Sequence, residues 1–355
     1  MTVLKIMRRL RSSLYTDLRI DREPAEMERA AAPMGSIFGT AHMPTLAKGI
    51  DLDAIDQTLI AELQRDGRSA FVDLARKVGL SEKTTRARIS SLLERNVIRI
   101  VALTSPYALG LHAIAFLGLR TDPSVAASQI ARKIAAIEDV DYVVVTTGRY
   151  SIIVEVLSAD VDAMRTTIEE RIGSTAGVQM MEIFPCFSLF YQKARFLAPV
   201  MGGTGVLVGS LSECDRQIAL ALSADGRIPY RILAEKIGVS ETYVRIRVAA
   251  MIESGQMAIL AITNPLAFKD RCVAWVAVKV AMGSQSEELA EILSHEECVS
   301  YVFICGGRFD LFIELICDSA QHLHDVLEKR IRALQQIQSF ETFVYLDLHY
   351  KVLGT

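Results

Sequence analysis

Apolar residues recur at helical spacing in three short segments that begin near residue 52. Residues 52–64 place leucine and isoleucine on one face, and Asp53 stands where it can cap the first turn. Residues 70–78 form a second predicted helix, which Gly79 ends. Ser81 caps a third helix, rich in basic residues, that runs to about residue 95. Two short helices, a glycine turn and a capped basic helix are typical of a helix-turn-helix domain.

The period of the pattern changes after residue 96. Residues 97–103 are apolar and extended, and a turn at Pro106 follows them. The later segments read as strand 112–119, helix 124–137, strand 142–147, strand 151–157, helix 160–172 and strand 178–187. This order predicts the ferredoxin-like α+β arrangement, in which two helices cover one face of a four-stranded antiparallel sheet. Because the strands are apolar on both faces, the open face of the sheet needs a partner.

The whole pattern occurs twice. A step of 159 positions carries Leu52 to Leu211, Arg88 to Arg247, and the segment Asp66-Gly67-Arg68 to Asp225-Gly226-Arg227. One step serves throughout, so no insertion or deletion separates the copies, and the period has the length of a whole module. Each copy offers the apolar sheet face that the other needs. The sequence therefore predicts an intramolecular pseudo-dimer, with the two sheets packed face to face.

The same patterns divide the chain into six predicted segments. They are a flexible N-terminal extension (1–49), a first helix-turn-helix domain (50–104), a first ferredoxin-like domain (105–196), a glycine-rich linker (197–209), a second helix-turn-helix domain (210–263) and a second ferredoxin-like domain (264–355). The extension begins with a basic stretch, so an arm that touches DNA is the alternative to a flexible tail.

Composition narrows the classes of function. The 355 residues are 51% hydrophobic with a net charge of −3, so any nucleic-acid surface must be local. The six cysteines show no Cys-x-x-Cys pair and no Cys/His ligand spacing, which indicates buried thiols in a reducing compartment rather than disulfides or a zinc site. No apolar run is long enough to span a bilayer. We therefore expect a cytoplasmic protein with no membrane partner, no metal and no cofactor.

The motifs resemble those of the leucine-responsive/asparagine-operon regulators (the Lrp/AsnC, or feast/famine, transcription factors). In copy 1 the matching residues are Leu52-Asp53-Ala54-Ile55-Asp56, Asp66-Gly67-Arg68, Val78-Gly79-Leu80-Ser81, Arg88, Ser105-Pro106 and Gly148-Arg149-Tyr150. In copy 2 they are Leu211 with Asp215, Asp225-Gly226-Arg227, Ile237-Gly238-Val239-Ser240, Arg247, Asn264-Pro265 and Gly307-Arg308-Phe309-Asp310. The resemblance covers residues 52–191 and 211–350. It implies a transcriptional regulator that binds double-stranded DNA, self-associates through its sheet domains and responds to an amino acid or a related small molecule.

DNA contact is expected at the third helix of each copy. The candidate residues are Ser81, Lys83, Thr84, Thr85, Arg86 and Arg88 in copy 1 and Ser240, Thr242, Tyr243, Arg245 and Arg247 in copy 2. Residues 81–99 carry five basic and two acidic side chains, a balance of +3, whereas residues 240–258 carry two of each. Since phosphate contacts scale with local positive charge, copy 1 is expected to bind DNA more strongly. Arg88 and Arg247 have an alternative role, bracing their helices through salt bridges.

The effector site is expected, from the resemblance, near the Gly-Arg-aromatic turns. The candidate residues are Gly148, Arg149, Tyr150 and Ser151 in copy 1 and Gly307, Arg308, Phe309 and Asp310 in copy 2. Relatives usually carry Asp at the last of these positions, and only copy 2 keeps it, so the sequence favours copy 2 for pairing with an amino group. The alternative is a plain hairpin turn, in which glycine supplies a positive φ.

Two other functions stay open. Siroheme decarboxylases resemble the same family and also occur as fused pairs, with His, Tyr and Arg close together in the sheet domain. The matching stretches here, residues 139–147 and 298–305, contain Tyr142 and Tyr301 but no histidine. We therefore expect that the chain is not an enzyme. The remaining alternative is an effector-sensing scaffold that does not bind DNA.

Overall fold

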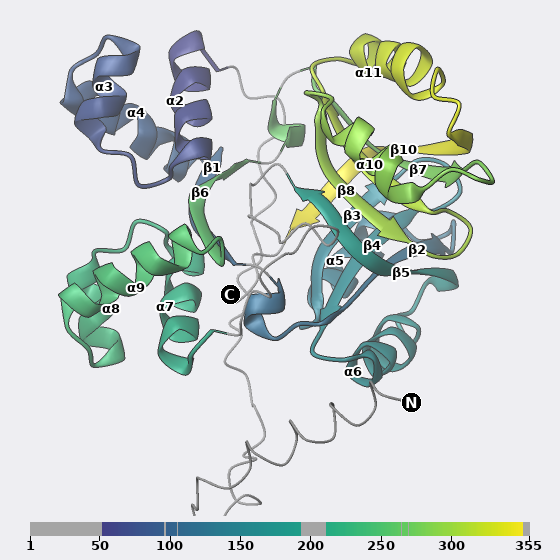
Figure 1. Ribbon diagram of the computed structural model, residues 1–355, viewed down its shortest axis with the longest axis horizontal. Helices are drawn as coiled ribbons and strands as arrows, with labels where there is room; N and C mark the ends of the chain where they lie inside the picture. Colours follow the sequence, from purple (N-terminus) through teal and green to yellow (C-terminus); the bar gives the residue numbers. More distant parts are fainter. Residues whose placement is uncertain are drawn as a thin grey trace, which may run out of the picture. The chain divides into compact units, whose positions relative to one another are not determined.

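The computed structural model describes residues 52–95, 97–104, 106–192, 211–263, 265–268 and 270–350. All of them belong to one compact unit, Thr40–Thr355 (Figure 1). The predicted N-terminal extension (1–49) and the predicted linker (197–209) lie outside the described residues. Among the helices that the structure describes, none is long and apolar enough to cross a membrane.

Each copy begins with three helices and a strand, as predicted. In copy 1 they are α2 (Ala54–Arg65), α3 (Phe71–Val78), α4 (Glu82–Glu94) and β1 (Ile98–Thr104). In copy 2 they are α7 (Glu213–Ala224), α8 (Tyr230–Ile237), α9 (Glu241–Glu253) and β6 (Met257–Thr263). The predicted caps are confirmed: the Asp53 carboxylate accepts from the Asp56 N–H, and Gly79 ends α3 in the left-handed region at φ +68°.

The two three-helix units form one head pair. Strands β1 and β6 pair antiparallel along their whole length, with Ile98 opposite Thr263 and Thr104 opposite Met257. The helices of both units share one buried apolar cluster, which contains Leu59 from copy 1 and its counterpart Ile218 from copy 2. The sequence predicted an extended segment here but not its partner. The ribbon between the copies therefore joins the two heads into one unit.

The second part of each copy has the predicted β-α-β-β-α-β order. In copy 1 it comprises η2 (Pro106–Leu109), β2 (Ala113–Thr121), α5 (Ala127–Ala135), β3 (Val140–Thr146), β4 (Ile152–Ser158), α6 (Val161–Thr166), the π-helical turn η3 (Thr167–Ile172) and β5 (Val178–Gln192). In copy 2 it comprises η4 (Pro265–Ala267), β7 (Cys272–Val280), α10 (Ser286–Ser294), β8 (Val299–Cys305), β9 (Leu311–Cys317), α11 (Ala320–Val326), the π-helical turn η5 (Leu327–Ile331) and β10 (Ile337–Tyr350). The α+β fold class is confirmed.

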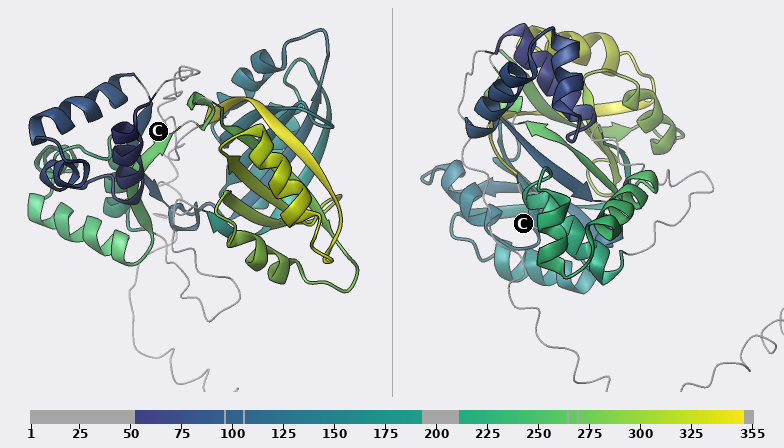
Figure 2. Two further views of the ribbon diagram at one scale, coloured as in Figure 1. Left: turned by 90° about the horizontal axis from the view of Figure 1, so that it is seen from above. Right: turned by 90° about the vertical axis from the view of Figure 1, so that its left-hand side faces the viewer.

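The two sheets are joined, not merely stacked. Strand β5 pairs with β2 of its own copy through Pro185 and continues alongside β8 of copy 2 from Cys186. Strand β10, yellow in Figure 2, pairs with β7 through Val344 and then with β3 of copy 1 from Tyr345. The result is a closed eight-stranded barrel in the order β10-β3-β4-β2-β5-β8-β9-β7. The predicted intramolecular pseudo-dimer is confirmed. The two sheets are also continuous with each other, because β5 and β10 each pair with strands of both copies.

Side chains fill the inside of the barrel, as expected for a closed sheet of this size. The interior is strongly aromatic: the rings of Phe116 and Phe303 stack with centroids 3.8 Å apart, and Phe303 stacks on Phe312 at 5.0 Å. The helices cover the outside, where the α5 residues Ile130 and Ile134 pack on the copy-1 strands. The copy-2 helices do the same on their half. The interior of the barrel is thus the interface between the copies.

Candidate DNA-binding heads and effector site

The exposed face of α4 carries most of the predicted DNA contacts of copy 1. Lys83, Thr84 and Arg86 are exposed, and Ser81 uses its hydroxyl to accept from the Thr84 N–H at 3.1 Å. In copy 2, Thr242, Tyr243 and Arg245 are exposed on α9, and Ser240 caps that helix in the same way. Each predicted third helix therefore presents its first two turns to solvent, where a recognition helix would contact DNA.

Thr85 is a correction to the predicted set. Its side chain is completely buried on the inner face of α4, and within the described residues its hydroxyl has no hydrogen-bond partner. The helical period explains the error, because Thr84 and Thr85 are adjacent in sequence but point to different faces. Thr84 faces solvent, whereas Thr85 faces the core of the head, so Thr85 cannot touch DNA in this conformation.

Arg88 and Arg247 each brace the third helix of their head through salt bridges. The Arg88 guanidinium donates to Asp53 at 2.7 Å and to Asp56 at 2.9 Å, which ties α4 to the start of α2. Its counterpart Arg247 makes a two-pronged pair with Asp215, at 2.7 and 2.6 Å. This pairing, with a hydrogen bond from Ser212, lowers the pKa of the Asp215 carboxyl. Both arginines are engaged within their own heads, so their geometry favours the structural role that the sequence left open.

The two Asp-Gly-Arg segments clamp the heads together. The Arg68 guanidinium donates to the carbonyls of Gly226 and Ile228, both at 3.0 Å. Arg227 returns the contact to the carbonyls of Gly67 at 2.7 Å and Ser69 at 2.9 Å. In the sequence, this motif marked only the repeat and the family resemblance. Its second role as a reciprocal contact between copies appears only when the two heads are seen side by side.

The glycine of each clamp is required by a close approach. The Gly67 N–H donates to the Ile259 carbonyl, and the Gly226 N–H donates to the Ile100 carbonyl, each at 2.8 Å. A Cβ atom on Gly226 would lie 2.9 Å from the Ile100 carbonyl oxygen, and one on Gly67 would lie 2.9 Å from the Leu260 Cα. Each turn therefore rests directly on the strand of the other copy.

Aromatic rings connect the clamps to the recognition helices. The Phe71 ring lies between the guanidinium groups of Arg86 and Arg227, at 4.1 and 4.6 Å from its centroid. The Tyr230 ring lies in the same way between Arg68 at 4.1 Å and Arg245 at 5.4 Å. Cation–π contacts of this kind orient the guanidinium planes. In each head, an arginine predicted to contact DNA (Arg86 or Arg245) therefore stacks on an aromatic ring. The clamp arginine of the other copy stacks on the same ring.

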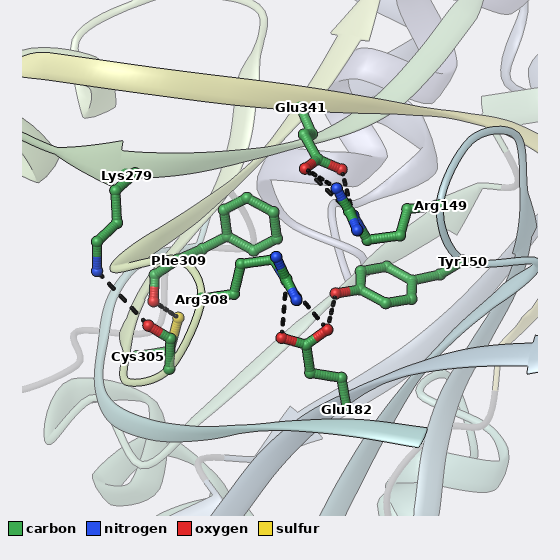
Figure 3. A network of polar contacts seen from close by, with 9 residues as sticks. Arg149, Tyr150, Glu182, Lys279, Cys305, Arg308, Phe309 and Glu341 are labelled. Atoms are coloured by element: carbon green, nitrogen blue, oxygen red, sulfur yellow. Dashed lines mark hydrogen bonds and ion pairs between the residues drawn. The ribbon is translucent and has the colours of Figure 1, made fainter. Parts of the chain in front are cut away.

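The Gly-Arg-aromatic turns also reach across to the other copy (Figure 3). Arg149 makes a two-pronged ion pair with Glu341 of β10, with both closest N–O distances at 2.9 Å. Arg308 repeats this contact with Glu182 of β5 at 2.9 Å, and the buried Tyr150 hydroxyl donates to the same carboxylate at 2.5 Å. Gly148 and Gly307 both have positive φ, at +93° and +119°. The turns therefore have the structural role of hairpins and a second role in holding the copies together.

The last position of each turn differs between the copies. In copy 2, the Asp310 carboxylate accepts from the Lys279 ammonium and from the Val280 backbone N–H, both at 2.8 Å. In copy 1 the counterparts are Ser151 and Arg120. Arg120 is exposed, and among the described residues no hydrogen bond or ion pair joins its guanidinium. The carboxylate that the sequence favoured for binding an amino group is therefore already neutralised by the protein's own ammonium.

An open cavity of about 690 Å³ lies beside the copy-1 turn. Its lining residues are Arg120, Thr121, Pro123, Gly148, Arg149, Ser151, Gln179 and Glu341. Glu341 comes from copy 2, so both copies build this cavity. Because Glu341 neutralises Arg149, the positive charge of Arg120 is left to face the cavity. Three of the predicted effector residues of copy 1 line it, whereas Tyr150 is buried beneath.

Two carboxylates lie inside the barrel, where the sequence predicted no site: Glu155 is buried and Glu314 is partly buried. Glu155 accepts from the Tyr301 hydroxyl at 2.9 Å, and its counterpart Glu314 accepts from Tyr142 at 3.0 Å and Tyr345 at 2.6 Å. Burial raises the pKa of Glu155 to about 7, against the lowering effect of the Tyr301 hydrogen bond. Tyr301 and Tyr142 each come from the copy opposite the glutamate that they contact, so these two pairs also join the copies, whereas Tyr345 belongs to the same copy as Glu314.

The fold and these sites define a duplicated helix-turn-helix protein with two effector-type sheet domains. Comparison with known proteins agrees: residues 52–93 and 211–252 match the AsnC-type helix-turn-helix domain, and residues 114–195 and 271–351 match the Lrp/AsnC ligand binding domain. The chain belongs to the Lrp/AsnC family. The first domain type implies DNA binding, and the second implies a capacity to bind an effector.

Relatives of ordinary length match about one copy of the chain. The HTH-type transcriptional regulator FL11 of Pyrococcus furiosus is 30% identical over 142 residues, which cover 40% of this chain and 93% of the relative. FL11 of Pyrococcus abyssi is 31% identical over 131 residues, covering 37% of this chain and 85% of the relative. A tandem pair in one chain is thus the length of two such relatives.

One solved structure is similar over most of the chain. The siroheme decarboxylase NirDL aligns over 84% of this chain and 93% of its own, with a TM-score of 0.57 and 16% identity. NirDL has also been solved in complex with an iron-uroporphyrin III analogue, where it gives a similar alignment. At this identity the likeness concerns the fold alone.

Proposed function

We propose that this chain is a sequence-specific DNA-binding transcriptional regulator in which one chain does the work of a family dimer. The observation that carries the proposal is the head pair: two complete helix-turn-helix units are joined by the β1–β6 ribbon and by the reciprocal Arg68 and Arg227 clamps. A rigid pair of heads fixes the spacing between the two recognition helices, and such spacing is what a pair of adjacent half-sites on DNA requires.

The two heads differ in the charge that they offer to phosphates. Lys83 and Arg95 are exposed in copy 1, and no ion pair engages either of them among the described residues. Their counterparts in copy 2 are Thr242 and Ser254, which carry no charge. Identical heads favour palindromic operators, whereas unlike heads favour unlike half-sites. We therefore expect an asymmetric operator with most of the electrostatic contact under copy 1.

Selection of bound fragments from a random DNA pool tests this proposal. The full chain is expected to enrich one sequence class with two dissimilar half-sites on the same face of the duplex. The Lys83→Thr variant, which gives copy 1 the residue found in copy 2, is the matched comparison and should weaken binding to the enriched site. If no sequence is enriched by a folded protein, the DNA-silent scaffold is the better account.

The effector in this proposal carries a carboxylate and binds the copy-1 cavity. Arg120 supports this choice, because it offers a charged donor to the cavity, while Asp310 of copy 2 is held by Lys279. Arginine pairs with carboxylates through two parallel hydrogen bonds. An amino acid or a related carboxylic acid meets this requirement. The preference for copy 2 that the sequence suggested is therefore replaced by copy 1.

A ligand panel tests the effector site. Amino acids and simple carboxylic acids are titrated against the full chain, with the melting temperature and DNA affinity as readouts. Arg120→Ala should weaken binding of the active compound by about tenfold or more, since a hydrogen bond to a charged group contributes roughly 1.5–3 kcal/mol. Lys279→Ala, the same truncation in copy 2, should leave binding intact. A ligand whose affinity depends on Lys279 and not on Arg120 would place the site in copy 2.

A siroheme-decarboxylase-like enzyme is the second candidate. It is favoured by the likeness to the NirDL fold and by polar groups enclosed in the barrel, including a Trp275 indole N–H without a partner among the described residues. Against it, stacked aromatic rings fill the same interior. In addition, the stretches that correspond to the decarboxylases' site, residues 139–147 and 298–305, contain no histidine. Absorbance of the purified protein decides between them, because a bound tetrapyrrole gives an intense visible band that a regulator lacks.

A further inference from the structure

Two cysteines and a histidine meet at one end of the copy-2 sheet. Cys298 immediately precedes β8, Cys317 ends β9, and His322 lies in α11. Their potential ligand atoms all lie within 4.8 Å of one another. Both thiols are buried, and the His322 side chain is 42% exposed, so an ion could reach the group from the side of α11. The three residues come from three different elements, which is why no Cys-x-x-Cys or similar spacing marks them in the sequence.

Copy 1 fills the same place in a different way. The counterparts of the two cysteines are Asp139 and Ser158, and the Ser158 hydroxyl donates to the Asp139 carboxylate at 3.3 Å. Thr167, at the start of the π-helical turn η3, donates to the same carboxylate at 2.5 Å. These hydrogen bonds tether the second helix of the domain to the strand ends. In copy 2, Val326 stands at the position of Thr167 and His322 at that of Ala163, so the hydroxyl that donates to the carboxylate in copy 1 has no counterpart in the sequence of copy 2.

We propose that Cys298, Cys317 and His322 bind a thiophilic divalent cation of the Zn²⁺ type, which tethers α11 to the strand ends of copy 2. Two thiolates and one imidazole form a donor set that tetrahedral Zn²⁺ prefers, and this soft set discriminates against Mg²⁺ and Ca²⁺. The fourth position is open to water. The proposal does not depend on DNA binding.

A neighbouring residue already orients the imidazole. His322 Nδ1 accepts from the Asp318 backbone N–H at 3.3 Å and lies 3.9 Å from the Asp318 carboxylate. For Nε2 to bind the cation, Nδ1 must carry the ring proton, so Nδ1 must donate to the Asp318 carboxylate instead of accepting from the backbone N–H, as ligating histidines usually do. On binding, both thiols lose their protons to solvent, so each cation that enters releases two protons. No oxidation or reduction occurs in this step.

Zinc content and affinity of the full chain test the proposal. Protein stripped by a chelator under reducing conditions and dialysed against Zn²⁺ should retain one equivalent. His322→Ala should lower the affinity by about 100-fold or more, whereas His324→Ala, on the same helix, should leave it unchanged. Co²⁺ should give a thiolate-to-cobalt charge-transfer band that Cys298→Ser and Cys317→Ser each weaken and the double variant removes.

Three results would overturn the site. They are the absence of stoichiometric Zn²⁺ in the wild-type chain, equal affinity in the His322→Ala and His324→Ala variants, and a Cys298–Cys317 disulfide in protein isolated without reductant that takes up no metal after reduction. Because the two histidine variants change residues at the surface of α11, a folding defect is readily separated by circular dichroism. The cysteine variants then add only the spectroscopic assignment of the ligands.

Discussion

The arginine contacts that hold the two copies together are the same in both directions, whereas several positions at the predicted DNA surface, the cavity and a helix tether differ. Arg68 and Arg227 exchange the same clamp, and Arg149 and Arg308 exchange the same ion pair with the long strand of the opposite copy. Other pairs have diverged: Lys83 corresponds to Thr242, Ser151 to Asp310, and Asp139 to Cys298.

This difference has a physical reason. Contacts across a pseudo-twofold axis must work in both directions, so a change in one copy is felt by both. Residues at a DNA surface, a cavity or a helix tether serve one copy alone. Fusion of the copies into one chain therefore constrains the shared interior and frees the two outer surfaces to specialise.

Removal of the arginine that braces a recognition helix is expected to have the largest effect on stability. Arg247→Ala leaves the Asp215 side chain, only 2% exposed, as a buried charge without its cation. The free energy of unfolding should fall by about 3 kcal/mol, as when one partner of a buried pair is removed. Arg88→Ala should cost less, because its partners Asp53 and Asp56 are 50% and 15% exposed and can be hydrated. Chemical denaturation measures both, and equal losses would break this comparison.

The two glutamates inside the barrel differ in their burial and in their partners. Glu314 accepts from three hydroxyl-bearing residues, Tyr142, Tyr345 and Ser300, whereas Glu155 accepts from Tyr301. Burial holds the pKa of Glu155 at about 7, above its ordinary value of 4.5. Because the folded state binds this proton more tightly than the unfolded chain does, the stability that it contributes is complete below pH 4.5. That stability is then lost as the pH rises through about 7.

The expected loss over this window is about 3 kcal/mol, since one pKa unit corresponds to about 1.4 kcal/mol. Denaturation curves from pH 5 to pH 8 measure it. Glu155→Gln keeps an acceptor for Tyr301 and should flatten the dependence, whereas Asp162→Asn, at an exposed carboxylate, should not. If the stability of the Glu155→Gln variant still falls between pH 5 and pH 8, groups other than Glu155 cause the pH dependence.

Substitution of the two clamp glycines, Gly67 and Gly226, is expected to lower the stability of the protein equally in the two copies. Gly67→Ala and Gly226→Ala each place a Cβ about 2.9 Å from backbone atoms of the other copy's strand. Each should cost roughly 1–3 kcal/mol, typical of overpacking, and loosen the contact between the heads. Stability and hydrogen exchange of the β1–β6 ribbon report the two effects. A large loss in one variant and none in the other would show that the clamp is not reciprocal in solution.

Much of the fold followed from local patterns in the sequence. The helical period, the caps at Asp53 and Ser81, and the glycine at position 79 each act over a few residues, so they can be seen without the fold. The constant step between the copies also predicted their pairing. Thr85 was misplaced because it adjoins Thr84, and only the exact rotation of α4 separates a buried hydroxyl from an exposed one.

Long-range features could not be predicted in the same way. The extension of β5 onto β8 depends on the partner strand, and the clamp role of Arg68 depends on carbonyls about 160 positions away. The Cys298, Cys317 and His322 group is assembled from three elements, with no regular spacing in the chain. The neutralisation of Asp310 by Lys279 likewise joins strand β7 to a distant turn. In each case the decisive partner is near in space and far in sequence.

The most direct test of the account compares equivalent arginines of the two recognition helices. Arg86→Ala and Arg245→Ala remove side chains that are paired and stacked in the same way, so their effects on the heads themselves should be similar. DNA affinity is measured for both variants and the wild type over a range of salt concentrations. The account predicts that Arg86→Ala binds more weakly and that the magnitude of its log K against log salt slope falls by about 0.9, with a smaller change for Arg245→Ala. Equal losses in the two variants would contradict the claim that fusion has produced unequal heads.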